Sequence, residues 1–130
     1  MANILVLDDV PEAGVLVQKI LAKKGHQVVA FTEEETALAY ARDHKLDLVI
    51  LDIKLKKMSG IEVLEELKKT DPTIRAIMLT GYPTVQTAQQ ARTLGANEYC
   101  VKPIDKEELE EKVSAVIGAD CAPASERAGA

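Results

Sequence analysis

The sequence predicts an α/β domain built on a doubly wound, five-stranded parallel sheet. Short apolar runs of strand length alternate five times with segments of helical apolar spacing. Parallel neighbours need such crossovers, which are nearly always right-handed, so we expect helices on both faces of the sheet. Aromatic residues make up only 3% of the chain, and a core of Val, Ile, Leu and Ala is typical of sheets packed between helices. With 130 residues, the chain is long enough for one such domain.

The first strand–helix unit starts at the N-terminus. The apolar run Ile4–Leu7 predicts a buried strand, which the acidic pair Asp8 and Asp9 closes. Pro11 suits a first helical turn, and Gly25 marks the end of the helix. The apolar residues expected on one face of this helix are Ala13, Leu16, Val17, Ile20 and Leu21.

The second and third units repeat this order. Val28–Phe31 predicts a strand, and Thr32 with Glu35 forms a capping box that starts a helix. The run Leu46–Leu51 predicts the third strand; its length also fits a buried helix, but its β-branched residues favour a strand. Asp52 ends this strand, and a second capping box opens the next helix after a loop. Ser59 and Glu62 form this capping box. The residues expected on the inward face of the helix are Ile61, Leu64 and Leu67.

The fourth and fifth strands end in a hydroxyl and an ammonium group. Ile74–Leu79 predicts the fourth strand, which ends in Thr80, and Tyr99–Val101 predicts the fifth, which ends in Lys102. The helix between them, from about Thr84 to Leu94, is expected to pack weakly because its inward residues are small. These inward residues are Val85, Ala88 and Ala91.

The final helix closes the domain. Asp105 and Glu108 are expected to cap it. Its apolar face has helical spacing and consists of Leu109, Val113, Val116 and Ile117. Small residues and Pro dominate afterwards, which predicts a folded domain over residues 1–118 and a disordered tail over residues 119–130.

Charge and composition exclude several functions. The net charge is −5 and the basic residues are dispersed, so direct nucleic-acid binding is not expected. The N-terminus lacks the features of a signal peptide, and no apolar stretch approaches the roughly 18 residues of a membrane span. Cys100 and Cys121 match no metal or disulfide pattern, so a reducing, cytoplasmic setting is expected.

The ends of the predicted strands carry the chemistry. Because parallel strands present their carboxyl ends at one edge of a sheet, five polar side chains should gather there: Asp8, Asp9, Asp52, Thr80 and Lys102. Clustered carboxylates repel one another, and an oxygen-only cluster is the type of site that holds Mg²⁺. With a hydroxyl and an ammonium group beside it, such a site suits phosphoryl transfer, and a carboxylate can itself be the nucleophile. The alternative is a solvated Asp52 that merely ends its strand.

The motifs at these strand ends resemble a known family. They are Leu7–Asp9, Leu51–Asp52 with Gly60 eight residues on, Leu79–Gly81 and Tyr99–Pro103. From about Ile4 to Ile117, the sequence resembles the receiver domains of two-component response regulators, in particular single-domain chemotaxis regulators. The resemblance implies a (βα)5 flavodoxin-like fold with strand order 2-1-3-4-5.

The resemblance also implies roles for the site residues. Asp52 would accept a phosphoryl group from a histidine kinase or phosphotransfer protein. Asp9, Asp52 and the backbone carbonyl of Lys54 would bind Mg²⁺ directly, and Asp8 would act mainly through water. Lys102 would hold a phosphoryl oxygen.

A conformational switch is a further implication of the resemblance. Thr80 and Tyr99 would be the switch residues, remodelling the surface of the fourth helix, fifth strand and fifth helix for an output partner or a second copy. The peptide bond Lys102–Pro103 would be cis. The domain would be a switch and not an enzyme, although it would promote its own phosphotransfer and slow dephosphorylation. The sequence departs from the family pattern at Lys56, where Pro is frequent, and at Gly81, where Ala is frequent.

Three alternatives remain open at this point. An aspartate-nucleophile phosphatase of the haloacid dehalogenase type uses the same residue types, but it needs a second Asp where this chain has Lys54. A degenerate receiver that binds its partner without phosphate is disfavoured by the complete set of site residues. Tyr99 can also be an ordinary strand aromatic.

Overall fold

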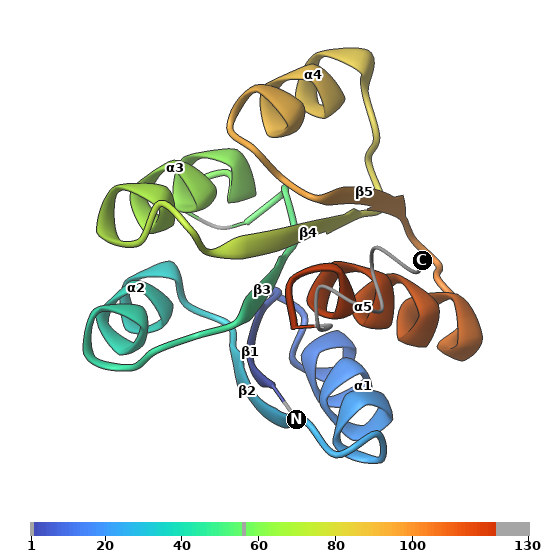
Figure 1. The fold of residues 1–130 in the computed structure, drawn as a ribbon. Helices are drawn as coiled ribbons and strands as arrows, with labels where there is room; N and C mark the ends of the chain where they lie inside the picture. The colour runs from blue at the N-terminus through green and yellow to red at the C-terminus, as the bar shows by residue number, and fades with distance from the viewer. Residues whose placement is uncertain (1, 56, 122–130) are drawn as a thin grey trace.

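The computed structural model describes residues 2–55 and 57–121. Along these residues, five strands alternate with five helices (Figure 1). In chain order the elements are β1 (Asn3–Leu7), α1 (Pro11–Ala22), β2 (Gln27–Phe31), α2 (Glu34–Asp43), β3 (Leu48–Leu51), α3 (Gly60–Thr70), β4 (Arg75–Thr80), α4 (Val85–Thr93), β5 (Glu98–Val101) and α5 (Lys106–Cys121).

The five strands form one parallel sheet in the order β2-β1-β3-β4-β5, which confirms the predicted fold class and strand order. Figure 1 shows α1 and α5 on one face of the sheet and α2, α3 and α4 on the other. The register sets Leu7 beside Leu51, so β1 and β3 end at a common level. Leu51 lies beside Met78, and β4 runs two residues further, to Thr80.

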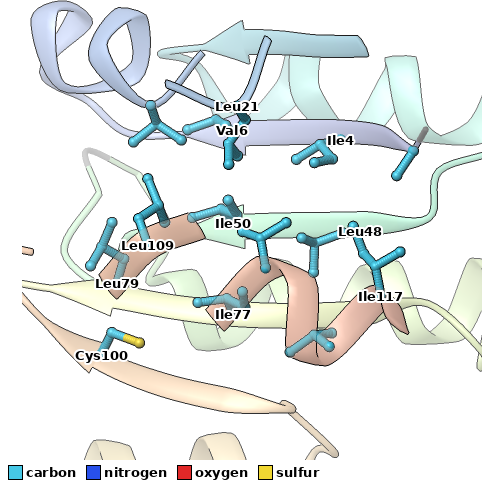
Figure 2. Close-up of a cluster of buried hydrophobic side chains, with 14 residues drawn as sticks. Ile4, Val6, Leu21, Leu48, Ile50, Ile77, Leu79, Cys100, Leu109 and Ile117 are labelled. Atoms are coloured by element: carbon cyan, nitrogen blue, oxygen red, sulfur yellow. The ribbon is translucent and has the colours of Figure 1, made fainter. Parts of the chain in front are cut away.

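The two faces of the sheet carry separate apolar clusters because side chains alternate along each strand. All four residues of β3 are buried. Leu48 and Ile50 point into the cluster beneath α1 and α5 (Figure 2), whereas Val49 and Leu51 point into the cluster beneath α2, α3 and α4. Because β3 is covered on both faces, its sequence is a continuous apolar run. This packing delivers Asp52 to the edge of the sheet.

Two predicted helix starts are confirmed and one is wrong. Ser59 and Glu62 form the expected capping box, and Asp105 Oδ1 accepts a hydrogen bond of 2.7 Å from the backbone of Glu108. The predicted box of Thr32 and Glu35 does not form, because the N-cap of α2 is Glu33 and its side chain makes no capping bond. The helix begins one residue later than the predicted box requires, so Thr32 precedes the N-cap and the N3 position is Thr36 and not Glu35.

Two side chains predicted to face inward are exposed instead. Leu16 on α1 is 59% exposed, because Val17 and Leu21 occupy the inner face of that helix. Val85 is the first residue of α4 and is 76% exposed. The predicted weak packing of α4 is confirmed, since Ala91 is its one buried residue.

The C-terminal helix is longer than expected. Its predicted apolar face is buried, and α5 continues to Cys121, beyond the predicted end near Gly118. Most of the predicted disordered tail, residues 122–130, lies outside the described residues. The domain boundary after residue 118 stays a prediction.

Candidate functional site

The acidic residues meet where β1 and β3 end. Asp8 follows β1 and Asp52 follows β3, and the backbone N–H of Asp52 donates to the carbonyl of Leu7 at 3.0 Å. Together with Asp9, they offer carboxylate oxygens that lie within 4.8 Å of one another. Asp8 and Asp52 are buried, and Asp9 is half-buried. The structure thus brings together the acidic cluster that the strand ends predict.

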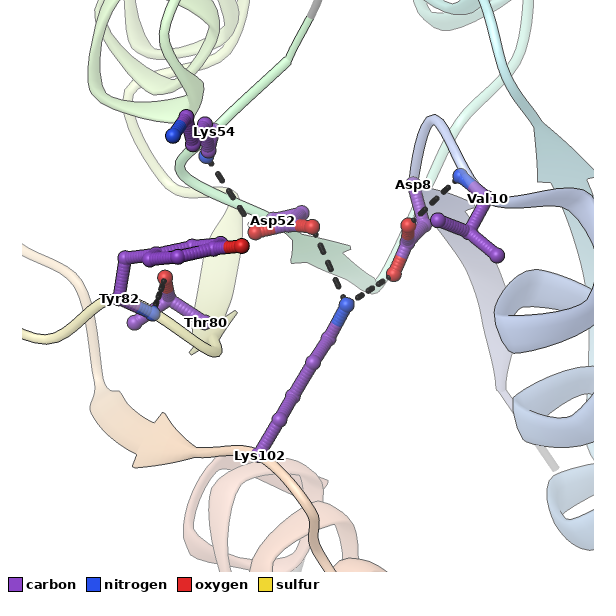
Figure 3. A network of polar contacts seen from close by, with 7 residues as sticks. All are labelled: Asp8, Val10, Asp52, Lys54, Thr80, Tyr82 and Lys102. Carbon is purple, nitrogen blue, oxygen red and sulfur yellow. Dashed lines mark hydrogen bonds and ion pairs between the residues drawn. The ribbon is translucent and has the colours of Figure 1, made fainter.

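Lys102 reaches this cluster from the far end of β5. Its Nζ lies 2.5 Å from Asp8 Oδ2 and 3.1 Å from Asp52 Oδ2 (Figure 3). Its backbone N–H donates to the carbonyl of Thr80 at 2.7 Å, which fixes the base of the side chain next to β4. The peptide bond between Lys102 and Pro103 is cis, as expected. One ammonium group therefore bridges two buried carboxylates.

The two bridged aspartates differ in how firmly their oxygens are held. Asp8 Oδ1 accepts a hydrogen bond of 2.9 Å from the backbone N–H of Val10, and Asp8 Oδ2 binds Lys102. Among the described residues, Asp52 Oδ1 accepts one long hydrogen bond, 3.3 Å, from the backbone N–H of Lys54. Asp52 Oδ1 is therefore the more weakly engaged oxygen, and weak engagement favours a nucleophile.

Burial controls the ionisation of the site. Burial raises the pKa of Asp52 above its usual value, even though the hydrogen bond and charge of Lys102 lower it. Burial alone would lower the pKa of Lys102, but its bonds to Asp8 and Asp52 outweigh burial and raise that pKa. Lys102 accordingly stays charged, whereas the Asp52 carboxylate is destabilised as an anion.

We expect Asp52 to make the stability of the metal-free protein depend on pH. Its pKa is raised in the folded state, so the folded chain binds this proton more tightly than the unfolded chain. This contribution is complete below the unfolded pKa, close to 3.8, and is lost as pH rises through the raised folded pKa. Urea unfolding in EDTA should show that the wild type loses stability relative to Asp52→Asn as the pH rises from about 4. Identical pH dependence in the two proteins would contradict this expectation.

A hydroxyl and an aromatic ring flank the acidic cluster. Thr80 ends β4 and is fully buried, and its Oγ1 accepts a hydrogen bond of 3.0 Å from the backbone N–H of Tyr82. The Tyr82 ring is 66% exposed and lies beside Asp52 in Figure 3. Lys54 Nζ lies 4.3 Å from the centroid of this ring, within the range of a cation–π contact. Lys54 and Tyr82 together border the approach to Asp52.

Tyr99 lies apart from the cluster and contacts α4. Its Oη is 2.7 Å from Thr87 Oγ1 and accepts a hydrogen bond of 3.4 Å from the backbone N–H of Thr84. Both contacts are at the start of α4, where Thr84 and Thr87 form a capping box. Tyr99 thus joins β5 to the most weakly packed helix.

Gly60 allows the loop after Asp52 to fold back onto the strand end. A Cβ atom at Gly60 would lie 2.0 Å from the Asp52 carbonyl oxygen and 2.8 Å from its carbonyl carbon. The backbone N–H of Gly60 also donates to the carbonyl of Ile53 at 2.7 Å. Only a residue without a side chain fits this close approach of two backbones.

We expect Gly60→Ala to destabilise the fold by about 3 kcal/mol, because backbone atoms cannot move away as a flexible side chain would. Gly118→Ala is the matched control, since nothing lies within 4 Å of a Cβ atom at Gly118. That substitution should be neutral or stabilising by up to about 1 kcal/mol. Thermal or urea unfolding of both variants measures the difference, and equal stabilities would refute the close-contact argument.

One buried carboxylate close to the site was not expected from the sequence. Glu34 is 1% exposed, and its Oε2 accepts hydrogen bonds from the backbone N–H groups of Lys57 and Met58 in the loop after Asp52. Three consecutive glutamates, residues 33–35, occur here. No local sequence signal distinguishes the buried one from its neighbours.

The donor set suits a hard divalent cation. Three carboxylates face a single ammonium group, which leaves an excess of negative charge in a largely buried site. The oxygens belong to carboxylates, with no softer ligand in the cluster. Mg²⁺ prefers oxygen ligands and commonly binds through one or two carboxylates. These residues therefore fit Mg²⁺.

An aspartate cluster with a bridging lysine and a buried hydroxyl, at the carboxyl edge of this sheet, has the parts of a phosphoryl-transfer site. Comparison with known proteins gives the family. The profile of the response regulator receiver domain matches residues 4–114. The chain therefore belongs to the response regulator receiver domain family, and as a receiver domain it is a phosphoacceptor switch of two-component signalling.

Individual relatives agree with this assignment. Sporulation initiation phosphotransferase F of Bacillus subtilis is 34% identical over 85% of this chain and 90% of its own length. Transcriptional regulatory protein ZraR of Salmonella typhimurium is 33% identical over 88% of this chain but only 26% of its own length. The chain thus spans about a quarter of the length of such regulators.

Solved structures give the same result. The CheY-like receiver domain protein of Methanospirillum hungatei superposes with a TM-score of 0.89 at 29% identity, covering 92% of this chain and 95% of the other. A receiver domain protein of Clostridium thermocellum reaches 0.85 at 30% identity, covering 92% and 96%. Within the described part of the chain, no helix is long and apolar enough to cross a membrane.

Proposed function

We propose that Asp52 is the residue that accepts the phosphoryl group. The observation that carries this proposal is the difference between the two oxygens of Asp52. Oδ2 is held by Lys102, which also binds Asp8, whereas Oδ1 accepts a long hydrogen bond from Lys54 and is weakly engaged. The donor would be a phosphohistidine of a histidine kinase or phosphotransfer protein. Oδ1 would attack phosphorus, the bond from phosphorus to the histidine nitrogen would break, and the imidazole would leave with its electron pair.

The neighbouring residues take complementary roles in this proposal. Asp9, Asp52 and the backbone carbonyl of Lys54 would hold Mg²⁺, with Asp8 acting mainly through water. When bound, Mg²⁺ would neutralise charge on the phosphoryl oxygens. Lys102 would turn from Asp52 to a phosphoryl oxygen, supplying a positive charge that is already positioned. Most of the catalysis would thus come from positioning and charge, without a further nucleophile.

The proposed switch runs through Thr80 and Tyr99. The Thr80 hydroxyl would bind the new phosphoryl group, and Tyr99 would transmit the change through its contacts with the start of α4. An element with one buried residue is easily shifted, as α4 would need to be. Exposed Val85 and Val101 give the surface of α4, β5 and α5 apolar contact area for a protein partner or a second copy.

The proposal places the switch in the cytoplasm, where ATP is available to phosphorylate a donor histidine. It assigns the receiver activity to residues 1–118 and includes no direct nucleic-acid or membrane contact by this domain. It also makes the protein a switch and not a turnover enzyme, although one relative is named a phosphotransferase.

Intact mass spectrometry tests the proposal. The purified protein is incubated with acetyl phosphate and either Mg²⁺ or EDTA. We expect a mass increase of one phosphoryl group with Mg²⁺ and none with EDTA. Continuous hydrolysis of phosphate monoesters would instead indicate a phosphatase, and the lack of an adduct with acetyl phosphate and with phosphoramidate would indicate a degenerate, binding-only receiver.

A further inference from the structure

Glu34 ties the first turn of α2 to the loop between β3 and α3. Its Oε2 accepts a hydrogen bond of 2.6 Å from the backbone N–H of Lys57 and one of 2.9 Å from that of Met58. Bonds from amides to a carboxylate are stronger than bonds between neutral groups. Because the residue is 1% exposed, solvent competes little for these bonds.

The loop that Glu34 holds begins at the proposed phosphoacceptor. Near its base, Lys54 pairs with Ser59 in an antiparallel bridge, and Gly60 donates to the carbonyl of Ile53. The two bonds to Glu34 fasten the far side of the same loop, at Lys57 and Met58. The loop is thus fixed on both sides of Lys54, whose backbone carbonyl is a proposed metal ligand.

The buried charge of Glu34 does not serve stability alone. Burial by itself would raise the pKa of Glu34, but the amides of Met58 and Lys57 outweigh burial and hold that pKa below its usual value. The side chain therefore stays charged. Its Oε1 is buried and has no hydrogen-bond partner within the described ranges, and burying such an atom costs free energy. An apolar residue of similar size would avoid this cost.

We propose that Glu34 is a positioning residue, which orients the β3–α3 loop so that the Lys54 carbonyl and Asp52 together bind the divalent cation. This inference rests on the proposed function. Glu34 touches neither the phosphoryl group nor the cation, and it acts through the backbone of the loop.

The test compares Glu34→Gln and Glu34→Met with a matched control, Glu35→Gln. Glu35 lies on the same helical turn, is exposed, and pairs with Lys57 Nζ at 2.8 Å on the surface. Each substitution removes one negative charge from the start of α2. Only changes at position 34 affect the bonds to the loop backbone: Glu34→Met removes both, and Glu34→Gln weakens them because its accepting oxygen is uncharged. The Met variant keeps the volume, and the amides it frees can bond to water because Lys57 is exposed.

Two measurements without a phosphodonor are decisive. Calorimetric titration with Mg²⁺ should show about tenfold weaker binding in Glu34→Met, the lower end of the effect of outer-shell partners on metal affinity, and a smaller loss in Glu34→Gln. Hydrogen exchange of the Lys57 and Met58 amides in the metal-free proteins should become faster in these variants. Glu35→Gln should match the wild type in both measurements.

The outcomes separate this inference from the proposed function. Unchanged Mg²⁺ affinity in folded Glu34→Met would overturn the positioning role, even if stability fell. An equal loss of affinity in Glu35→Gln would also overturn it, because the cause would then be general charge. Failure of the wild type to acquire a phosphoryl group from acetyl phosphate would refute the proposed function instead.

Discussion

Asp52→Asn is expected to abolish the phosphoryl adduct while leaving the protein folded. Asn has nearly the same shape as Asp, and its side-chain oxygen can still accept the hydrogen bond from Lys102 Nζ. It lacks an anionic oxygen that can attack phosphorus. Intact mass after incubation with acetyl phosphate and Mg²⁺ should therefore show the unmodified protein only.

The control for this prediction is Asp43→Asn, at the exposed end of α2. It removes the same charge at the end of α2 that leads into the start of β3, whereas the acidic cluster lies where β3 ends, and it should be phosphorylated as the wild type is. An adduct that persists in Asp52→Asn would show that another carboxylate accepts the phosphoryl group. Asp8 is the less suitable choice, because both of its oxygens are engaged by Val10 and Lys102.

The acidic edge was predictable because topology alone creates it. In a parallel sheet, every strand ends at the same edge, so residues directly after strands become neighbours whatever their separation in sequence. Asp8 and Lys102 are 94 positions apart, yet their charged atoms are in direct contact. Apolar runs that are buried on both faces made the strand ends easy to locate.

Side-chain directions on the helices were less predictable. Helical spacing predicts which side of a helix is apolar, but not how much of that side the sheet covers. Leu16 and Val85 were therefore assigned to the core although both are exposed. The residues at 33–35 are a sharper case. The three glutamates have the same helix propensity and charge. Glu34 is the buried one because it contacts the backbone of Lys57, in a loop 23 residues away. Tertiary packing overrides the local capping signal at this position.

Lys102→Met is expected to lower the free energy of unfolding by about 3 kcal/mol near pH 7 in EDTA, because it leaves two buried carboxylates without their shared cation. The Lys102 side chain is 26% exposed and those of Asp8 and Asp52 are 5% and 9% exposed, so water screens their repulsion poorly. Lys112→Met is the control, since Lys112 forms a more exposed ion pair with Glu98 at 3.2 Å. Its loss should cost at most about 1 kcal/mol.

Two conditions distinguish charge repulsion from lost packing in Lys102→Met. Lowering the pH to about 4 should shrink the stability deficit, because burial raises the pKa of Asp52 and its protonation removes the repulsion with Asp8. Adding Mg²⁺ should stabilise the variant more than the wild type, because the carboxylates no longer have the Lys102 ammonium as a counter-ion. The rate of phosphorylation should nevertheless stay about a hundredfold below that of the wild type, since the ammonium that would bind the transferred oxygen is gone. A deficit that is unaffected by both pH and Mg²⁺ would show that Lys102 stabilises the fold through its alkyl chain, and the charge argument would fail.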